Sequence, residues 1–304
     1  MATPTSNVLL TGRDLDILAT LDRCPLTAEQ MHALSWTFAL PFTSERRVRE
    51  RLQQLGAAGR VRRWHYATAG RGALGYYTLS LLGFQILHGD SERYAPKRAF
   101  APVGLARQHH TYCLAEFIVH LAIATHQAGW KLTGFYRENA CRLPVGDEVI
   151  YPDCAFQLVA EGRPPHSFFV ELDNSTEVIR SDADRDSWQR KLRLYDAFQD
   201  SVPDRFRVIV LATRSSERIQ HILDAARDVV RNPQRALIYG GTLRDFLARP
   251  DALVAPCFRD HAGRRRAIVW HARPVLTDSK NDPCEPAPAP CYAVPPVVAS
   301  ATPA

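Results

Sequence analysis

Hydrophobic positions in the first third of the chain recur at helical spacing. Three short amphipathic stretches come first, and two β-rich runs at residues 61–66 and 75–79 and an apolar run at residues 81–87 follow. Val48, Leu52 and Leu55 form the buried side expected of the third helix. The residues expected to cap the three helices at their N-termini are Thr11, Thr27 and either Thr43 or Ser44. Residues 10–87 are therefore predicted to form three helices, a β-hairpin and a fourth helix.

From residue 104 onwards, helical and strand patterns alternate. The predicted helices cover residues 104–127, 177–199, 216–230 and 242–247. The predicted strands cover residues 130–138, 149–159, 168–173, 207–213, 235–239 and 267–270. Residues 207–213 are almost continuously apolar, which is typical of a strand covered on both faces. This order predicts an α/β fold, or more broadly α+β, in which helices pack against a sheet.

Composition divides the chain into five segments. We expect disorder over residues 1–9, a first domain over 10–88, a polar linker over 89–102, a second domain over 103–275 and a disordered Pro/Ala-rich tail over 276–304. No apolar run approaches the roughly 18–20 residues of a membrane span, and the first residues lack the pattern of a signal peptide. The seven cysteines are scattered without CxxC spacing, which favours a reducing cytoplasm and argues against a structural zinc site.

The net charge of +6 has a definite location. Residues 43–75 contain eight arginines and two glutamates, so this window carries the whole net charge of the chain. Two helices, a basic helix and a basic hairpin, in that order, are typical of a winged helix-turn-helix that binds duplex DNA. The arginines expected to contact DNA are Arg46, Arg47, Arg49 and Arg51 on the third helix and Arg62, Arg63 and Arg71 on the hairpin.

Three carboxylates mark the second domain. Glu171 and Asp173 alternate along one predicted strand and so share a face, and Asp153 lies on the strand expected to pair with it. Because Mg²⁺ prefers oxygen ligands, Asp153, Glu171 and Asp173 are predicted to bind Mg²⁺ or Mn²⁺. The spacing of Pro152-Asp153 and Glu171-Leu172-Asp173 resembles that of the PD-(D/E)xK nucleases. This resemblance implies a nuclease-like α/β domain in which Lys191, on the following helix, replaces the lysine of the motif.

A larger set of residues resembles the replication-relaxation family of bacterial plasmids and mobile elements. The segments that carry the likeness are His109-His110, Leu114–Phe117, Tyr151–Asp153, Phe169–Asp173, Thr176-Glu177 and Lys191–Tyr195. The likeness implies a winged helix joined to a PD-(D/E)xK-type core and a role in replication control, mobilisation or transcription. The nuclease resemblance also adds Glu116, an acid on the helix before the sheet, to the candidate catalytic residues.

Three functions remain open at this point. The first is a DNA-binding accessory or regulatory protein, and the second is a metal-dependent endonuclease that uses Asp153, Glu171, Asp173 and Lys191. In the third, the second domain only oligomerises a transcription regulator. The expected partners are double-stranded DNA, a relaxase or replication initiator, and a second copy of the chain. The motifs GxxxxGK[ST] and GxSxG are absent, which argues against the enzyme classes that depend on them.

Overall fold

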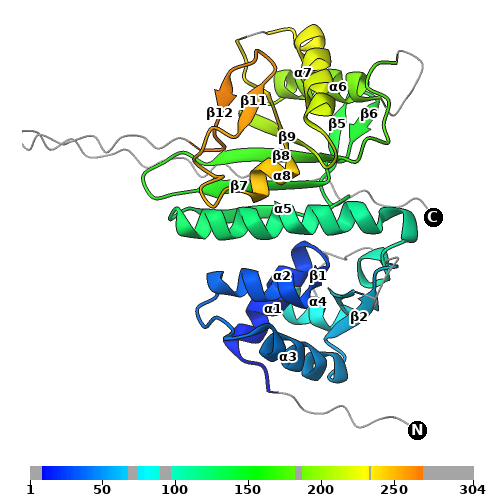
Figure 1. The fold of residues 1–304 in the computed structure, drawn as a ribbon. Helices are drawn as coiled ribbons and strands as arrows, with labels where there is room; N and C mark the ends of the chain where they lie inside the picture. Colours follow the sequence, from blue (N-terminus) through cyan, green and yellow to red (C-terminus); the bar gives the residue numbers. More distant parts are fainter. Residues whose placement is uncertain (1–8, 68–73, 90–96, 182–186, 233, 270–304) are drawn as a thin grey trace, which may run out of the picture.

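The computed structural model describes residues 9–67, 74–89, 97–181, 187–232 and 234–269 (Figure 1). The predicted disorder at residues 1–8 and 276–304 and the candidate Arg71 lie outside these residues. The chain has a mixed α/β fold. In the described part of the chain, no helix combines the length and the apolar character needed to cross a membrane.

The N-terminal unit contains four α-helices and a small sheet. Its helices are α1 (Gly12–Arg23), α2 (Ala28–Leu34), α3 (Glu45–Ala57) and α4 (Leu81–His88), with the 3₁₀ turn η1 (Ser35–Thr37) after α2. Its strands are β1 (Leu26–Thr27), β2 (Val61–His65) and β3 (Gly75–Leu79), in the antiparallel order β1-β3-β2. Local capping explains the helix starts: the side chains of Thr11, Thr27, Ser44 and Ser80 each accept a backbone N–H of the first turn.

A seven-stranded mixed sheet dominates the rest of the chain. Its order is β12-β11-β10-β9-β8-β7-β4, in which β8, β9 and β10 run parallel and the other neighbours are antiparallel. Its strands are β4 (Lys131–Tyr136), β7 (Cys154–Val159), β8 (His166–Asp173), β9 (Phe206–Ala212), β10 (Ile238–Thr242), β11 (Phe258–Asp260) and β12 (Arg265–Arg266). A separate hairpin joins β5 (Leu143–Val145) to β6 (Glu148–Ile150).

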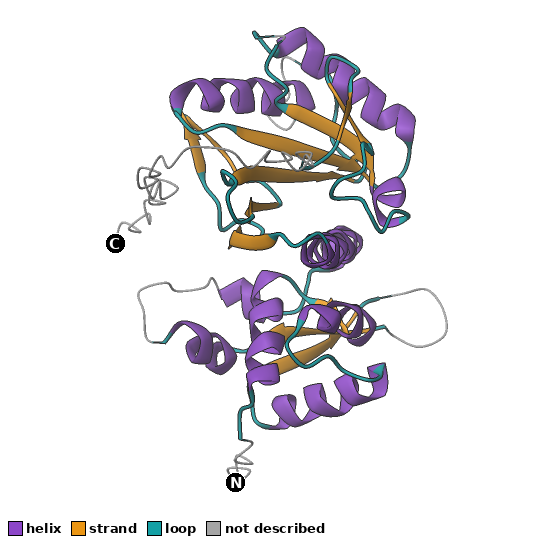
Figure 2. Cartoon of the chain, turned by 90° about the vertical axis from the view of Figure 1, so that its left-hand side faces the viewer, coloured by secondary structure: helices purple, strands orange, loops and turns teal. Residues whose placement is uncertain are grey.

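Helices cover the sheet on both sides. Helices α6 (Trp188–Ser201) and α7 (Ser216–Val229) lie on one face. On the other face lie α5 (Gln108–Gln127) and α8 (Leu243–Leu247), with the N-terminal unit beyond α5. Figure 2, turned by 90°, shows α5 nearly end-on between the sheet and the N-terminal unit. Two short 3₁₀ turns, η2 (Lys97–Phe100) and η3 (Leu105–Arg107), precede α5.

One hydrophobic core extends through α5 into both parts of the chain. It includes Met31 and Leu34 of α2, Phe117 of α5, and Phe168 and Leu172 of β8. A second core lies between the opposite face of the sheet and helices α6 and α7. Because α5 is buried on both sides, the N-terminal unit packs directly against the sheet-bearing part.

Several predicted elements differ from those observed. The helix predicted over residues 177–199 begins only at Trp188, where Ser187 caps it. The strand predicted over residues 149–159 is divided, because Tyr151, Pro152 and Asp153 separate β6 from β7. The last predicted strand, at residues 267–270, is replaced by the hairpin of β11 and β12. Helix α7 begins at Ser216, as predicted, and Ser215 caps it.

Candidate functional site

Asp153 lies where the chain enters β7, beside the C-terminal half of β8. Its backbone N–H donates to the carbonyl of Val170 (2.9 Å), and its Oδ2 accepts the N–H of Leu172 (2.7 Å). The first bond joins the backbone of Asp153 to β8, and the second fixes the carboxylate through Oδ2 and leaves Oδ1 available. Oδ1 lies 3.1 Å from Nε2 of His110 on α5. The two atoms are at ion-pair distance, but their alignment is not that of a hydrogen bond.

Glu171 is a buried carboxylate on the α6 face of β8, with 2% of its surface exposed. Its Oε1 accepts the hydroxyl of Tyr195 (2.6 Å), and its Oε2 accepts Nζ of Lys191 (3.0 Å). Lys191 and Tyr195 are four residues apart on α6 and so project from one face of the helix. Lys191 also donates to Glu177, at 3.1 and 3.2 Å. The ammonium group is therefore held between two carboxylates.

The pKa values of Glu171, Lys191 and Tyr195 are all shifted from their usual ranges. Burial raises the pKa of Glu171 to about 7, although the charge of Lys191 opposes the shift; the charge of Asp153 adds to it. Burial lowers the pKa of Lys191, but Glu171 and Glu177 more than offset this and the pKa ends above its usual range. Burial, followed by the charge of Glu171, raises the pKa of Tyr195 well above 10. A carboxyl group with a pKa near 7 can gain or lose a proton at neutral pH, as a general acid or base must.

Both carboxylate oxygens of Asp173, which the sequence predicts to be a metal ligand, accept hydrogen bonds from other residues of the protein. Arg218 holds both of its oxygens in a fork, with Nε to Oδ2 at 2.8 Å and Nη2 to Oδ1 at 2.9 Å. The indole of Trp188 also donates to Oδ1 (2.9 Å), and the N–H of Ser175 donates to Oδ2 (3.1 Å). Asp173 therefore anchors α6 and α7 to the end of β8, and its lone pairs are already used.

Glu116 is also placed away from the expected site. It lies on the face of α5 that contacts α2, and Nε2 of Gln30 donates to its Oε1 at 2.6 Å. Because successive residues of a helix point in different directions, the acid on α5 faces the N-terminal unit while His110 faces the sheet. Glu116 therefore joins the two parts of the chain and does not lie beside Asp153 or Glu171.

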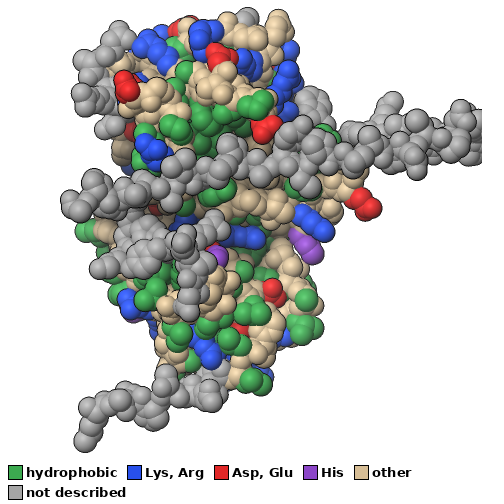
Figure 3. Space-filling model, turned by 180° about the vertical axis from the view of Figure 1, so that it is seen from behind, with side chains coloured by type: hydrophobic (Ala, Val, Ile, Leu, Met, Phe, Trp, Pro, Cys, Tyr) green, Lys and Arg blue, Asp and Glu red, His purple; other side chains and the backbone are tan. Residues whose placement is uncertain are grey.

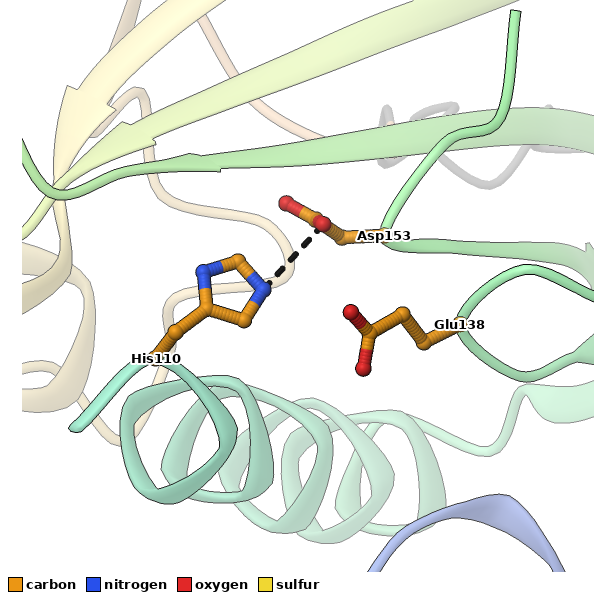
Figure 4. A group of neighbouring side chains, drawn as sticks. All are labelled: His110, Glu138 and Asp153. Atoms are coloured by element: carbon orange, nitrogen blue, oxygen red, sulfur yellow. Dashed lines mark ion pairs between the residues drawn. The ribbon is translucent and has the colours of Figure 1, made fainter. Parts of the chain in front are cut away.

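The structure adds two residues to the candidate site. His110, Glu138 and Asp153 each present a ligand atom, and these atoms all lie within 4.8 Å of one another (Figure 4). His110 belongs to the His109-His110 pair noted in the sequence, but Glu138 lies in the turn after β4, where no local pattern distinguishes it. Among the described residues, His110, Glu138 and Asp153 therefore bring three potential ligand atoms together, whereas Asp173 of the predicted set is held by Arg218.

On the N-terminal unit, three predicted arginines are exposed on α3. The exposed fractions of the side chains of Arg46, Arg47 and Arg49 are 86%, 69% and 64%. Arg46 and Arg47 contact Glu50 at 2.9 and 3.1 Å, and Arg49 contacts Glu45 at 2.6 Å. A groove of about 910 Å³ runs between α3 and the β2–β3 hairpin.

Arg51 departs from the expectation of an exposed DNA contact. Its Nε donates to Oδ1 of Asp14 at 2.6 Å and its Nη2 to Oδ2 at 2.5 Å, and the Asp14 side chain is fully buried. This arginine therefore joins α3 to α1. Arg62 and Arg63 on β2 are exposed, and Arg62 also donates to the carbonyl of Phe100 at 3.3 Å.

The comparison with protein families identifies the chain. The family model described as replication-relaxation matches residues 21–205, more than half of the chain. The chain belongs to the replication-relaxation family. This replication-relaxation match begins in α1 and ends just before β9. It therefore includes all of α3, the group of His110, Glu138 and Asp153, and the group of Glu171, Glu177, Lys191 and Tyr195. A search of curated proteins found no match. The family indicates a role in the replication or mobilisation of a plasmid or mobile element.

Proposed function

We propose that this replication-relaxation protein is a DNA-binding accessory or regulatory protein whose N-terminal unit is a winged helix. In this proposal α3 enters the major groove and the β2–β3 hairpin is the wing. The observation that carries it is the exposure of Arg46, Arg47 and Arg49 on the side of α3 opposite its buried residues.

The ion pairs on α3 do not weaken this proposal. Exposed pairs such as Arg46–Glu50 contribute at most about 1 kcal/mol, so the arginines can exchange their glutamates for phosphates at small cost.

The basic side chains near α6 and α7 are a weaker candidate for the DNA-binding surface. Figure 3 shows Lys and Arg side chains around the end that carries α6 and α7. There Arg231 and Arg235 share Asp196 and Asp200.

The salt dependence of duplex binding tests the proposal. Each arginine that neutralises a phosphate should contribute about −0.9 to the slope of log K against log salt. We therefore expect Arg47→Ala and Arg49→Ala each to reduce affinity at low salt and to make this slope shallower by about 1 if the arginine neutralises a phosphate. Arg244→Ala, an exposed arginine on α8, is the matched control and should change neither. Equal effects of all three variants would contradict binding through α3.

A second candidate function is metal-dependent cleavage of a phosphodiester bond. It is favoured by the convergence of Asp153 just before β7, Glu171 on β8 and Lys191 on α6. The charge of Asp153 contributes to the pKa shifts of both other groups. Asp153 would help hold a divalent cation, which would supply charge for the transferring phosphate. Glu171 would accept a proton, and Lys191 would stabilise developing negative charge.

Nicking of supercoiled plasmid tests the second candidate. With Mn²⁺ or Mg²⁺, we expect the protein to nick DNA and Lys191→Met to abolish nicking while duplex binding remains. Lys131→Met, an exposed lysine on β4, is the control and should still nick. Binding without nicking by the wild-type protein would remove the second candidate and leave the first. A relaxase or initiator as partner, and a homodimer, remain predictions.

A further inference from the structure

The three potential ligands at Asp153 come from three separate parts of the fold. His110 belongs to the first turn of α5, Glu138 to the turn after β4, and Asp153 to the start of β7. Their ligand atoms lie within 4.8 Å of one another (Figure 4). Ligands at about 2.1 Å from one cation are roughly 3 Å apart, so shifts of an ångström or two complete the site. Side-chain rotations alone can supply such shifts.

Asp153 is already oriented to act as a monodentate ligand. The N–H of Leu172 occupies Oδ2, while Oδ1 faces His110. A hydrogen bond to the second oxygen of a ligating carboxylate is the usual way in which a protein fixes its direction. The carboxylate therefore needs no rearrangement of the backbone to bind a cation.

His110 has a partner that can adapt to either tautomer. The amide of Asn174 lies 3.1 Å from Nδ1 of His110, and Thr213 lies 2.9 Å from the other end of that amide. If the amide turns over, its oxygen accepts the proton of Nδ1 and its nitrogen donates to Thr213, whose hydroxyl keeps the carbonyl of Asp173 as its acceptor (3.3 Å). Nε2 then carries the lone pair that a metal requires.

The carboxylate of Glu138 forms an ion pair with an arginine side chain. Its Oε1 contacts the guanidinium of Arg107, and that arginine side chain is 57% exposed. The same residues, Arg107 and Glu138, line a cavity of about 190 Å³ between the N-terminal unit and the start of α5. An exposed arginine can swing into solvent at small cost, so Arg107 occupies a position that a metal ion can take over.

The ligand types determine which metal fits. One imidazole nitrogen with two carboxylates suits first-row transition metals, whereas Mg²⁺ prefers oxygen ligands and retains its waters. We propose that His110, Glu138 and Asp153 bind a transition-metal ion of the Mn²⁺ or Zn²⁺ class in preference to Mg²⁺. This proposal adds a metal identity to the cleavage candidate above, but metal binding itself does not depend on cleavage.

Titration of the metal-free full-length protein with Mn²⁺, followed by calorimetry and by electron paramagnetic resonance, tests the site. We expect one ion per chain and a nitrogen coupling from His110 in the resonance spectrum. His110→Gln should remove the coupling and weaken binding by at least about tenfold. His109→Gln changes the neighbouring exposed histidine, which contacts the sulfur of Cys113, and should preserve both. Arg107→Ala should strengthen binding, since the competing cation is gone.

Several results would overturn the proposal. Unchanged Mn²⁺ affinity in His110→Gln would show that the ion binds elsewhere, and Mg²⁺ affinity equal to that of Mn²⁺ would contradict the role of the imidazole. Thermal unfolding without metal shows whether each variant is folded. If His110→Gln is unfolded, Glu138→Gln takes its place and should lose affinity by a similar factor. Binding without nicking supports the site and removes only the cleavage candidate, whereas nicking without binding removes the site.

Discussion

Replacing Glu171 with Gln should change how the stability of the protein depends on pH. In the folded protein burial raises the pKa of Glu171 from 4.5 to about 7. A group whose pKa is higher in the folded state stabilises the fold below its unfolded pKa, and this contribution is lost as the pH rises through the folded pKa. The fold therefore favours the protonated Glu171, and the relevant window runs from about pH 4.5 to about pH 7.

The size of the effect follows from the shift. One pKa unit corresponds to about 1.4 kcal/mol, so the full shift corresponds to roughly 3 kcal/mol, of which about 2 to 3 kcal/mol falls between pH 5 and pH 8. The wild-type protein loses this contribution as the pH rises, but Glu171→Gln has no proton to lose. The free energy of unfolding of the wild type minus that of Glu171→Gln should therefore fall by that amount from pH 5 to pH 8.

Urea unfolding at a series of pH values measures this difference. Glu161→Gln, which changes an exposed glutamate in the turn between β7 and β8, is the control for the substitution itself. If the Glu171→Gln difference stays constant from pH 5 to pH 8, burial does not govern the proton on Glu171. If the difference grows with pH, the attraction to Lys191 outweighs burial and the reasoning is wrong.

Two further substitutions test how the fold is held together. Arg218→Met leaves the buried Asp173 carboxylate without its cation and should cost about 3–5 kcal/mol in urea unfolding, and a second change of Asp173→Asn should recover part of the loss. Gly83→Ala places a Cβ 2.1 Å from the carbonyl oxygen of Arg60 and should lower the free energy of unfolding by about 1–3 kcal/mol. Gly12→Ala, with no atom within 4 Å of its added Cβ, should be neutral or stabilising, and equal losses at the two glycines would contradict the packing argument.

The parts of the fold that depend on local sequence were predictable. Thr11, Thr27 and Ser44, all among the expected caps, do cap the first three helices, because a cap needs only its own side chain and the next turn. The helix expected from residue 177 fails for a non-local reason. The Glu177 side chain forms an ion pair with Lys191, which lies 14 positions further along the chain. Propensity alone does not contain that contact.

The candidate site was only half predictable. Lys191 and Tyr195 follow from helical spacing, and Asp153 and Glu171 from the pairing of their strands. The position of Glu138 depends instead on the pairing of β4 with β7, whose register shifts between Thr133 and Tyr136. A bulge of this kind redirects the residues that follow it, and the sequence does not show where it falls. The ion pair between Asp173 and Arg218 likewise joins residues that are 45 positions apart, so the local sequence does not predict it.

Helix α5 also restricts which changes of length the chain can accept. One part of α5 presents Glu116 to α2, and another presents His110 to Asp153. Each residue of an α-helix advances its direction by about 100° and its position by about 1.5 Å. A single residue inserted or deleted between His110 and Glu116 would rotate one contact surface about 100° away from its partner. Length differences among members of the family are therefore expected in the surface turns and not within this helix.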